Sequence, residues 1–192
     1  MRKLIAMLMA LLMICGAALA DNADELTALE FEHFTLAIRK DAVGTGADTI
    51  ENNVPFLVVY QDYDPSKQFC SNMNAVWNEN VLDLDGFTPE MMATETLKYT
   101  LDLYQQSGVK AENARVLNAE FDELNEKRAV SFITCVDLDY SGMGLDLQIT
   151  LYTLQAVVPL EGIGTYTFTI STNDLENCDE LFDIVDSVRW KD

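Results

Sequence analysis

The sequence is poor in basic residues and contains a single histidine, and these two shortages exclude several classes of function. Lys and Arg total 12 against 32 Asp and Glu, which gives a formal net charge of −20 over 192 residues. Nucleic acids and anionic membrane surfaces bind proteins through clustered Lys and Arg, so we expect no nucleic acid and no anionic lipid surface as a partner. The lone His33 leaves little room for zinc sites or histidine-based catalysis.

Motifs that carry chemistry are also missing. No C-x-x-C pair is present, so neither a thioredoxin-type redox site nor a zinc knuckle is indicated. The segment 140–144 lacks the G-x-S-x-G order of a nucleophile elbow, and Gly44-Thr45-Gly46 is too short for a dinucleotide fingerprint. We therefore expect no catalytic residue and no cofactor, and we interpret His33 as a sheet or surface residue rather than a general base.

The one long apolar run lies at the N-terminus. Met1-Arg2-Lys3 is basic, Leu4 to Ala20 carry no charge, and Ala18-Leu19-Ala20 has the small-x-small form of a cleavage site. This layout predicts a signal peptide over 1–20, cleaved after Ala20, because a membrane span needs about 20 apolar residues. Two alternatives stay open: an uncleaved anchor and a lipoprotein that uses Cys15. We expect a secreted protein or one of the periplasm or cell envelope.

Beyond this leader we expect one domain. Residues 21–30 are polar and predict a flexible lead-in, and residues 31–192 are long enough to bury a core of their own. No second long apolar stretch follows, so we expect no membrane insertion after cleavage. The high negative charge favours a soluble monomer. It also favours a basic or neutral protein or small ligand as the partner.

Three cysteines remain after the leader, namely Cys70, Cys135 and Cys178. Export makes a disulfide plausible, and an odd count leaves one thiol over. Three different single bridges are open, as are three isolated thiols.

Alternating apolar and polar residues predict most of the secondary structure as strands. Phe34, Leu36 and Ile38 alternate with polar neighbours, and Tyr166, Phe168 and Ile170 alternate with threonines. The strands expected are 34–38, 72–80, 114–121, 128–138, 145–157 and 164–171. A further strand is expected over 55–63, where a nearly continuous apolar run suits a strand buried on both faces. Residues 41–53, which hold Gly44 and Gly46, predict a loop. Short turns between consecutive strands imply antiparallel pairing.

Two helices complete the pattern. Thr88 is an N-cap residue, Pro89 suits the first helical position and Gly108 suits a left-handed end, so a helix is predicted over 89–107. A second helix is predicted over 175–188, with one apolar and one acidic face. We therefore predict an α+β fold with a predominantly antiparallel sheet of six to seven strands, on which one long and one C-terminal helix pack.

This order of elements resembles the PsbP/DcrB-like superfamily of small extracytoplasmic proteins. The matching pieces are the strand Phe34-Thr35-Leu36-Ala37-Ile38, the helix 89–107, the meander 114–171 and the final helix that ends in Ile184 to Trp190. The resemblance implies an antiparallel sheet with flanking helices and a non-catalytic role as accessory subunit or adaptor. The superfamily shares no catalytic motif, so no residue role is transferred.

Two groups of acids are candidate sites. Asp137 and Asp139 have the same strand parity, so they can lie on one sheet face. Paired carboxylates are the catalytic groups of glycosidases. Asp83, Asp85 and Glu90 are calcium candidates, because Asp83-Leu84-Asp85-Gly86 resembles the middle of an EF-hand loop, although the complete loop is absent.

Polar strand positions suggest a third, broader surface. We expect a polar sheet face if the helices cover only the other face, built from Thr35, Gln148, Thr150, Tyr152, Thr165, Thr167 and Thr169. The sequence favours a non-enzymatic binding or accessory module. A carboxylate-dependent hydrolase and a calcium-stabilised structural domain are the alternatives.

Overall fold

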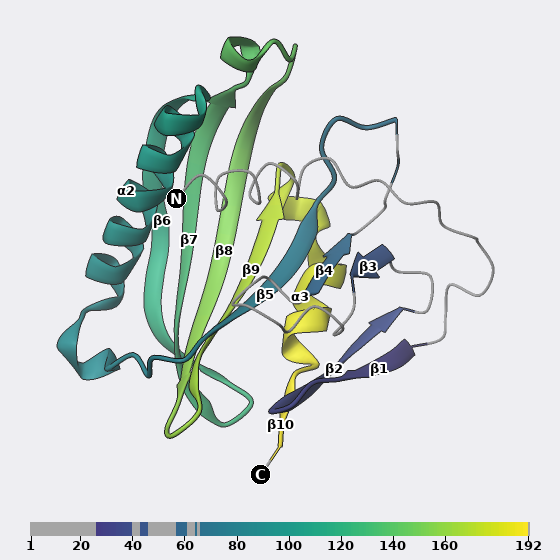
Figure 1. The fold of residues 1–192 in the computed structure, drawn as a ribbon, viewed down its shortest axis with the longest axis vertical. Helices are drawn as coiled ribbons and strands as arrows, with labels where there is room; N and C mark the ends of the chain where they lie inside the picture. Colours follow the sequence, from purple (N-terminus) through teal and green to yellow (C-terminus); the bar gives the residue numbers. More distant parts are fainter. Residues whose placement is uncertain (1–25, 40–42, 46–56, 61–63, 65, 192) are drawn as a thin grey trace.

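The computed structural model describes residues 26–39, 43–45, 57–60, 64 and 66–191. Within them the strands form two antiparallel sheets (Figure 1). The larger, seven-stranded sheet has the order β3-β4-β5-β9-β8-β7-β6 and the smaller has the order β1-β2-β10. The predicted signal peptide lies outside the described residues.

The strands of the larger sheet come from the middle of the chain. Their bounds are β3 Val43–Thr45, β4 Leu57–Tyr60, β5 Asn72–Asn78, β6 Lys110–Leu124, β7 Lys127–Asp139, β8 Gln148–Leu160 and β9 Gly164–Thr172. The strands β6 to β9 form a continuous antiparallel meander with short turns. Short 3-10 turns, η2 Leu84–Gly86, η3 Ser141–Met143 and η4 Leu175–Asn177, connect the regular elements.

The smaller sheet joins distant parts of the chain. Strand β2 (Phe34–Arg39) lies between β1 (Leu26–Glu30) and β10 (Arg189–Trp190). Phe34 pairs with Trp190 across this sheet. Its ring also meets Tyr166 and Phe168 of β9 edge-on, with centroids 5.3 and 5.5 Å away. This aromatic cluster fastens the smaller sheet to the larger one.

The long helix α2 (Pro89–Ser107) begins and ends where the sequence predicted. The Thr88 hydroxyl accepts a hydrogen bond from the Met91 amide at 3.2 Å, and Gly108 adopts a left-handed φ of 85°. Figure 1 shows α2 running along β6 and β7. It packs against Val130, Phe132, Val136 and Leu138 through its buried residues.

The second helix, α3 (Asp179–Asp186), covers the opposite face. Leu181, Ile184 and Val185 pack with Leu154, Val158 and the smaller sheet in the main core cluster. The seven-stranded sheet is therefore covered by α2 on one side and by α3 with β1, β2 and β10 on the other. The predicted α+β fold, with one long and one C-terminal helix on an antiparallel sheet, is confirmed.

The structure also corrects several boundaries. Leu26–Glu30, expected within the flexible lead-in, forms β1, because its backbone pairs with β2 along five residues. Val43–Thr45, expected in a loop, forms β3 on the edge of β4. The final helix is shorter than expected, since η4 occupies 175–177 and α3 starts at Asp179. In the described part of the chain, no helix is both long and apolar enough to cross a membrane.

Candidate functional site

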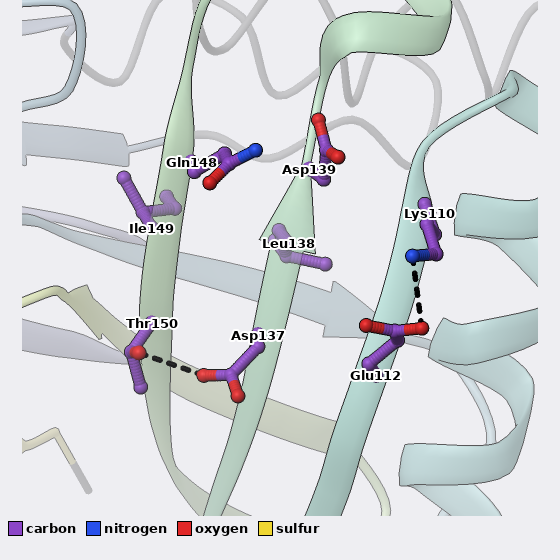
Figure 2. A pocket seen from close by; sticks show the side chains of 8 residues that line it. All are labelled: Lys110, Glu112, Asp137, Leu138, Asp139, Gln148, Ile149 and Thr150. Carbon is purple, nitrogen blue, oxygen red and sulfur yellow. Dashed lines mark hydrogen bonds and ion pairs between the residues drawn. The ribbon is translucent and has the colours of Figure 1, made fainter.

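An open pocket of about 430 Å³ lies on the sheet face opposite α2, where β6, β7 and β8 run side by side. Figure 2 shows its lining side chains, which come from Lys110, Glu112, Asp137, Leu138, Asp139, Gln148, Ile149 and Thr150. The main core cluster covers the other end of this face through Leu154 and Ala129. The pocket therefore occupies the end of the face that the core cluster leaves to solvent.

The alternation of β7 places both aspartates in this pocket. Val136 and Leu138 are buried against α2, so Asp137 and Asp139 point to the opposite face. The sequence-based expectation that the two aspartates share a face holds in the structure.

The strand register arranges six pocket side chains in two rows across the sheet. In one row, Lys110 is opposite Asp139 and Asp139 is opposite Gln148. In the other row, Glu112 is opposite Asp137 and Asp137 is opposite Thr150. Three carboxylates and one ammonium group thus occupy a patch that is three strands wide.

Hydrogen bonds hold Asp137 in place. Asn113 Nδ2 donates to Asp137 Oδ2 at 2.7 Å, and Thr150 Oγ1 donates to Asp137 Oδ1 at 2.7 Å. These two bonds, and more weakly the Arg115 guanidinium, lower the pKa of Asp137 below its ordinary value of 3.8. The carboxylate is therefore ionised and oriented before any ligand arrives.

A β-bulge in β6 supplies one of these donors. The β6–β7 register shifts between Glu112 and Arg115, and Asn113 adopts a left-handed φ of 53° in between. Bulges are common next to binding sites because they redirect a side chain. Here the bulge brings the Asn113 amide onto the Asp137 carboxylate.

Asp139 and Lys110 are also fixed by neighbours. The Ser141 amide donates to Asp139 Oδ1 at 2.8 Å, and this bond is the main reason why the pKa of Asp139 is lowered. Lys110 Nζ lies 2.9 Å from Glu112 Oε1. That hydrogen bond and the Glu112 charge raise the pKa of Lys110.

This electrostatic pattern favours binding over acid–base catalysis. A carboxyl that acts as general acid at neutral pH needs a raised pKa, whereas both pocket aspartates have lowered values. Half-buried, ionised and pre-oriented carboxylates are suited to holding a cationic group. Neither pocket aspartate therefore has the raised pKa that the general acid of a carboxylate-dependent hydrolase needs.

Two of the three calcium candidates, Asp83 and Asp85, have other contacts. Asp83 Oδ1 accepts a hydrogen bond from the Asp85 amide at 2.9 Å and so caps η2. Asp85 Oδ1 lies 2.6 Å from Arg128 Nη1, and Glu90 belongs to the first turn of α2. Across the residues that the structure describes, no three His, Cys, Asp or Glu side chains converge as a metal site would require. Asp83 and Asp85 thus have contacts of their own in the approach to α2, and calcium binding by the three acids stays a prediction.

The three cysteines are free, so of the alternatives that the sequence left open the structure has three isolated thiols rather than a bridge. They lie in different parts of the fold: Cys70 just before β5, Cys135 within β7 and Cys178 at the start of α3. Burial raises the pKa of both the Cys135 and the Cys178 thiol. Two of the three are therefore unreactive core residues.

His33 contacts neither a serine nor a thiol in any interaction recorded for the described residues. Its Nε2 lies 3.9 Å from a Glu32 oxygen, and its ring meets Tyr166 edge-on at 6.3 Å. It sits in the turn before β2. This position agrees with its interpretation as a surface residue.

The expected single polar face is wrong. Thr150 pairs with Asp137 on the pocket side, whereas Thr167 pairs with Val157, which packs against the α2 side. Thr35 belongs to the smaller sheet. The polar positions therefore lie on two faces and two sheets, because strand parity alone does not relate one strand to the next.

Sequence reasoning found Asp137, Asp139 and Thr150 but missed Lys110, Glu112 and Asn113. The strand was expected to start at 114, so these three residues fell outside it. Asn113 was a sequence signal for the bulge, because asparagine is rare in strands and tolerates the left-handed backbone conformation that a bulge needs.

Comparison with known proteins supports the fold. No family model and no curated protein matches the sequence. Among solved structures, the cyanobacterial PsbP (CyanoP) of Synechocystis sp. PCC 6803 matches with a TM-score of 0.62 and 18% identity, over 94% of this chain and 99% of that one. The Ran-binding protein Mog1p of Saccharomyces cerevisiae matches more weakly, with a TM-score of 0.49 and 13% identity over 86% and 95% of the two chains. The PsbP-like fold expected from the sequence is confirmed.

Proposed function

We propose that this chain is an extracytoplasmic, non-enzymatic accessory module that binds a partner through the pocket on β6, β7 and β8. The observation that carries the proposal is the set of pre-oriented, ionised carboxylates at the uncovered end of the sheet. Asp137 accepts two side-chain hydrogen bonds and Asp139 accepts a backbone one, although both lie at the surface. Ordering polar side chains costs conformational entropy, and a ligand then binds without that cost.

Two further features agree with this role. The PsbP-like fold supports an accessory function, since the superfamily that the sequence resembles consists largely of non-catalytic extracytoplasmic proteins. The basic, apolar and small-x-small segments of residues 1–20 support export. Cell fractionation with N-terminal sequencing tests the second feature: recovery from the envelope or medium with Asp21 as first residue supports a cleaved signal peptide, and recovery from the cytoplasm alone with Met1 intact contradicts export.

A retention experiment tests the binding role. The immobilised protein is incubated with envelope extract, beside a double variant Asp137→Asn, Asp139→Asn. A second double variant, Asp102→Asn, Asp183→Asn, removes the same charge from exposed positions on α2 and α3. We expect at least one protein that the native chain and the helix variant retain and the pocket variant loses. Identical retention by all three proteins contradicts the proposal.

A further inference from the structure

We infer that the free edge of β6 receives an extended segment of a protein partner, which pairs with β6 as an added strand and alternates apolar with basic side chains. β6 is the outermost strand of the seven-stranded sheet and pairs with β7 alone (Figure 1). With 15 residues it is the longest sheet edge in the described part of the chain, since β3 has three residues and β1 has five. The segment of β6 that carries the inference, residues 118–122, lies outside the pocket, so the inference goes beyond the proposed function.

The hairpin between β6 and β7 determines which backbone groups of β6 point outward. Asn125 and Glu126 have positive φ values of 48° and 69° and form a two-residue turn between the paired residues Leu124 and Lys127. In such a hairpin the two residues that flank the turn bond each other through both N–H and C=O. Counting back from Leu124, every second residue of β6 therefore directs its N–H and C=O away from β7.

These outward groups are open at Ala119 and Phe121. The β6–β7 register is regular from Asn118 to the turn, so the outward positions are 119, 121 and 123. The Glu123 amide donates to Asp122 Oδ1 at 2.8 Å, as an outward N–H can. Among the described residues, no hydrogen bond reaches the outward groups of Ala119 and Phe121. An unpaired strand edge of this kind is a template for an incoming strand.

On the α2 side, this edge offers an exposed apolar side chain. Phe121 is opposite Val130, which packs in the cluster beneath α2, so both side chains lie on that side. The Phe121 ring is 48% exposed, and the Arg128 guanidinium lies 4.9 Å from its centroid. An apolar residue beside Phe121 would bury apolar surface, whereas a basic one would approach Arg128. The added strand should therefore be apolar on this side.

On the other side, the same edge is acidic. Asp122 is opposite Ala129, which belongs to the main core cluster on the face away from α2, and Glu120 has the same parity. Both carboxylates are exposed. Opposite charges on neighbouring strands stabilise their pairing, so the added strand should be basic on this side. The net charge of −20 attracts a basic segment as well.

Fluorescence anisotropy with labelled peptides tests the alternation. The probe is Thr-Lys-Val-Lys-Val-Lys-Val-Lys-Thr, and its isomer Thr-Lys-Lys-Val-Val-Lys-Lys-Val-Thr has the same composition without strict alternation. The measurement is made at an ionic strength of about 0.15 M, where long-range attraction is largely screened. We expect the native chain to bind the alternating peptide about tenfold more tightly than the isomer, because only the former matches both sides of the edge.

Methylation of the peptide backbone separates strand pairing from attraction by charge. When the peptide pairs antiparallel with Ala119 and Phe121, its valines direct their N–H groups at β6 and its lysines direct theirs away. N-methylation of the central valine should weaken binding about tenfold, because it removes a ladder hydrogen bond and blocks close approach. N-methylation of the next lysine should change the affinity by no more than about twofold.

Variants of β6 provide the matching test on the protein. Ala119→Pro removes an outward N–H and leaves the β6–β7 ladder intact, so it should weaken binding of the alternating peptide about tenfold. If this variant folds poorly, Phe121→Lys places an ammonium group where a valine would pack and should have a similar effect. The control Tyr99→Lys makes the same change at an exposed aromatic residue of α2 and should stay within about twofold. Circular dichroism and urea unfolding establish that each variant is folded.

Three results would overturn the inference. Equal affinity for the two peptides, or equal effects of the two methylations, would mean general attraction to an acidic surface. An equal loss in Tyr99→Lys and Phe121→Lys would mean the same. Sedimentation that finds a dimer, which Ala119→Pro dissociates, would make a second copy of this chain the occupant of the edge. Each of these results leaves the role of the pocket untouched, because the retention experiment with Asp137→Asn, Asp139→Asn tests a different surface.

Discussion

At the scale of single residues, Gly164 occupies a position that no other residue fits. It opens β9 with a φ of 137°, and a Cβ there would lie 2.3 Å from the Asn78 carbonyl oxygen and 2.6 Å from Trp77 Nε1. Backbone strain and a clash with main chain should together make Gly164→Ala destabilising by roughly 2–4 kcal/mol. Urea unfolding measures the loss. Gly86→Ala is the control, because the nearest atom to its Cβ is 3.9 Å away; an equal loss there would refute the explanation.

The pocket aspartates should make stability depend on acid pH. The folded-state pKa of Asp137 is lowered by its bonds to Asn113 and Thr150. A lowered folded pKa contributes stability that is present above the unfolded value, near pH 4, and is lost as pH falls through the folded value. Asp137→Asn should therefore flatten the fall of the urea midpoint between about pH 4 and pH 2. Asp183→Asn serves as charge control, and a flattening of the same size in both variants would count against the hydrogen bonds as the cause.

The three thiols should differ sharply in reactivity. Cys135 and Cys178 are fully buried, whereas Cys70 is half-buried and its Sγ lies 3.6 Å from the Asp64 carbonyl oxygen. A thiol reagent applied to native residues 21–192 should modify Cys70 alone, because its side chain is the only one of the three with access to solvent and burial raises the pKa of the Cys135 and Cys178 thiols. Denaturant should expose all three. Mass spectrometry that finds a bridged pair would contradict the free thiols and support one of the bridges that the sequence left open.

At the scale of elements, the N-cap residue of α2 contributes measurably to the stability of the fold. Thr88 Oγ1 accepts the Met91 amide, which otherwise has no partner in the first turn of a helix. Thr88→Ala should cost about 1 kcal/mol in unfolding free energy. Thr94→Ala, at an exposed mid-helix site, should be neutral or slightly stabilising, since alanine has the higher helix propensity. Equal effects of the two changes on the urea midpoint would contradict the capping role.

Elements with strong local signals were predictable from sequence. Thr88, Pro89 and Gly108 determined α2 to the residue, and the alternation of Tyr166, Phe168 and Ile170 located β9 within one residue. These features depend on neighbours close in the chain, such as a cap or a two-residue period. The short strands β1, β3 and β10 were missed because their existence depends on a partner strand far away in the sequence.

The site was predictable only in part for the same reason. The parity of Asp137 and Asp139 follows from β7 alone, so their common face was foreseen. Their neighbours Glu112 and Asn113 depend on the register between β6 and β7, which a bulge shifts. Register is a property of a pair of strands and is fixed by packing and turn geometry, so one strand's sequence does not contain it.

At the scale of the whole molecule, the turn between β6 and β7 holds the C-terminal segment. Asn125 has a left-handed φ of 48°, and its Nδ2 donates to the carbonyls of Asp186 at 3.1 Å and Val188 at 2.6 Å. Asn125→Gly keeps the turn conformation and removes both bonds, so it should cost about 1–2 kcal/mol. It should also speed hydrogen exchange at the Lys191 amide, which donates to the His33 carbonyl.

The neighbouring turn residue is the control for this prediction. Glu126 also has a positive φ, of 69°, so Glu126→Gly relieves strain without touching the bonds to the C-terminal segment. We expect an unchanged or slightly higher urea midpoint. Unchanged exchange at Lys191 in Asn125→Gly would show that the turn does not hold the segment.

The position of β2 between β1 and β10 has a consequence for biosynthesis. Protein chains emerge from the ribosome N-terminus first, and β2 receives its partner Arg189–Trp190 only after some 150 further residues have been added. Phe34 and Leu36 therefore stay without their final packing throughout translation of this domain. A nascent chain that has not completed its fold can be bound by chaperones and can still pass through a narrow translocation channel.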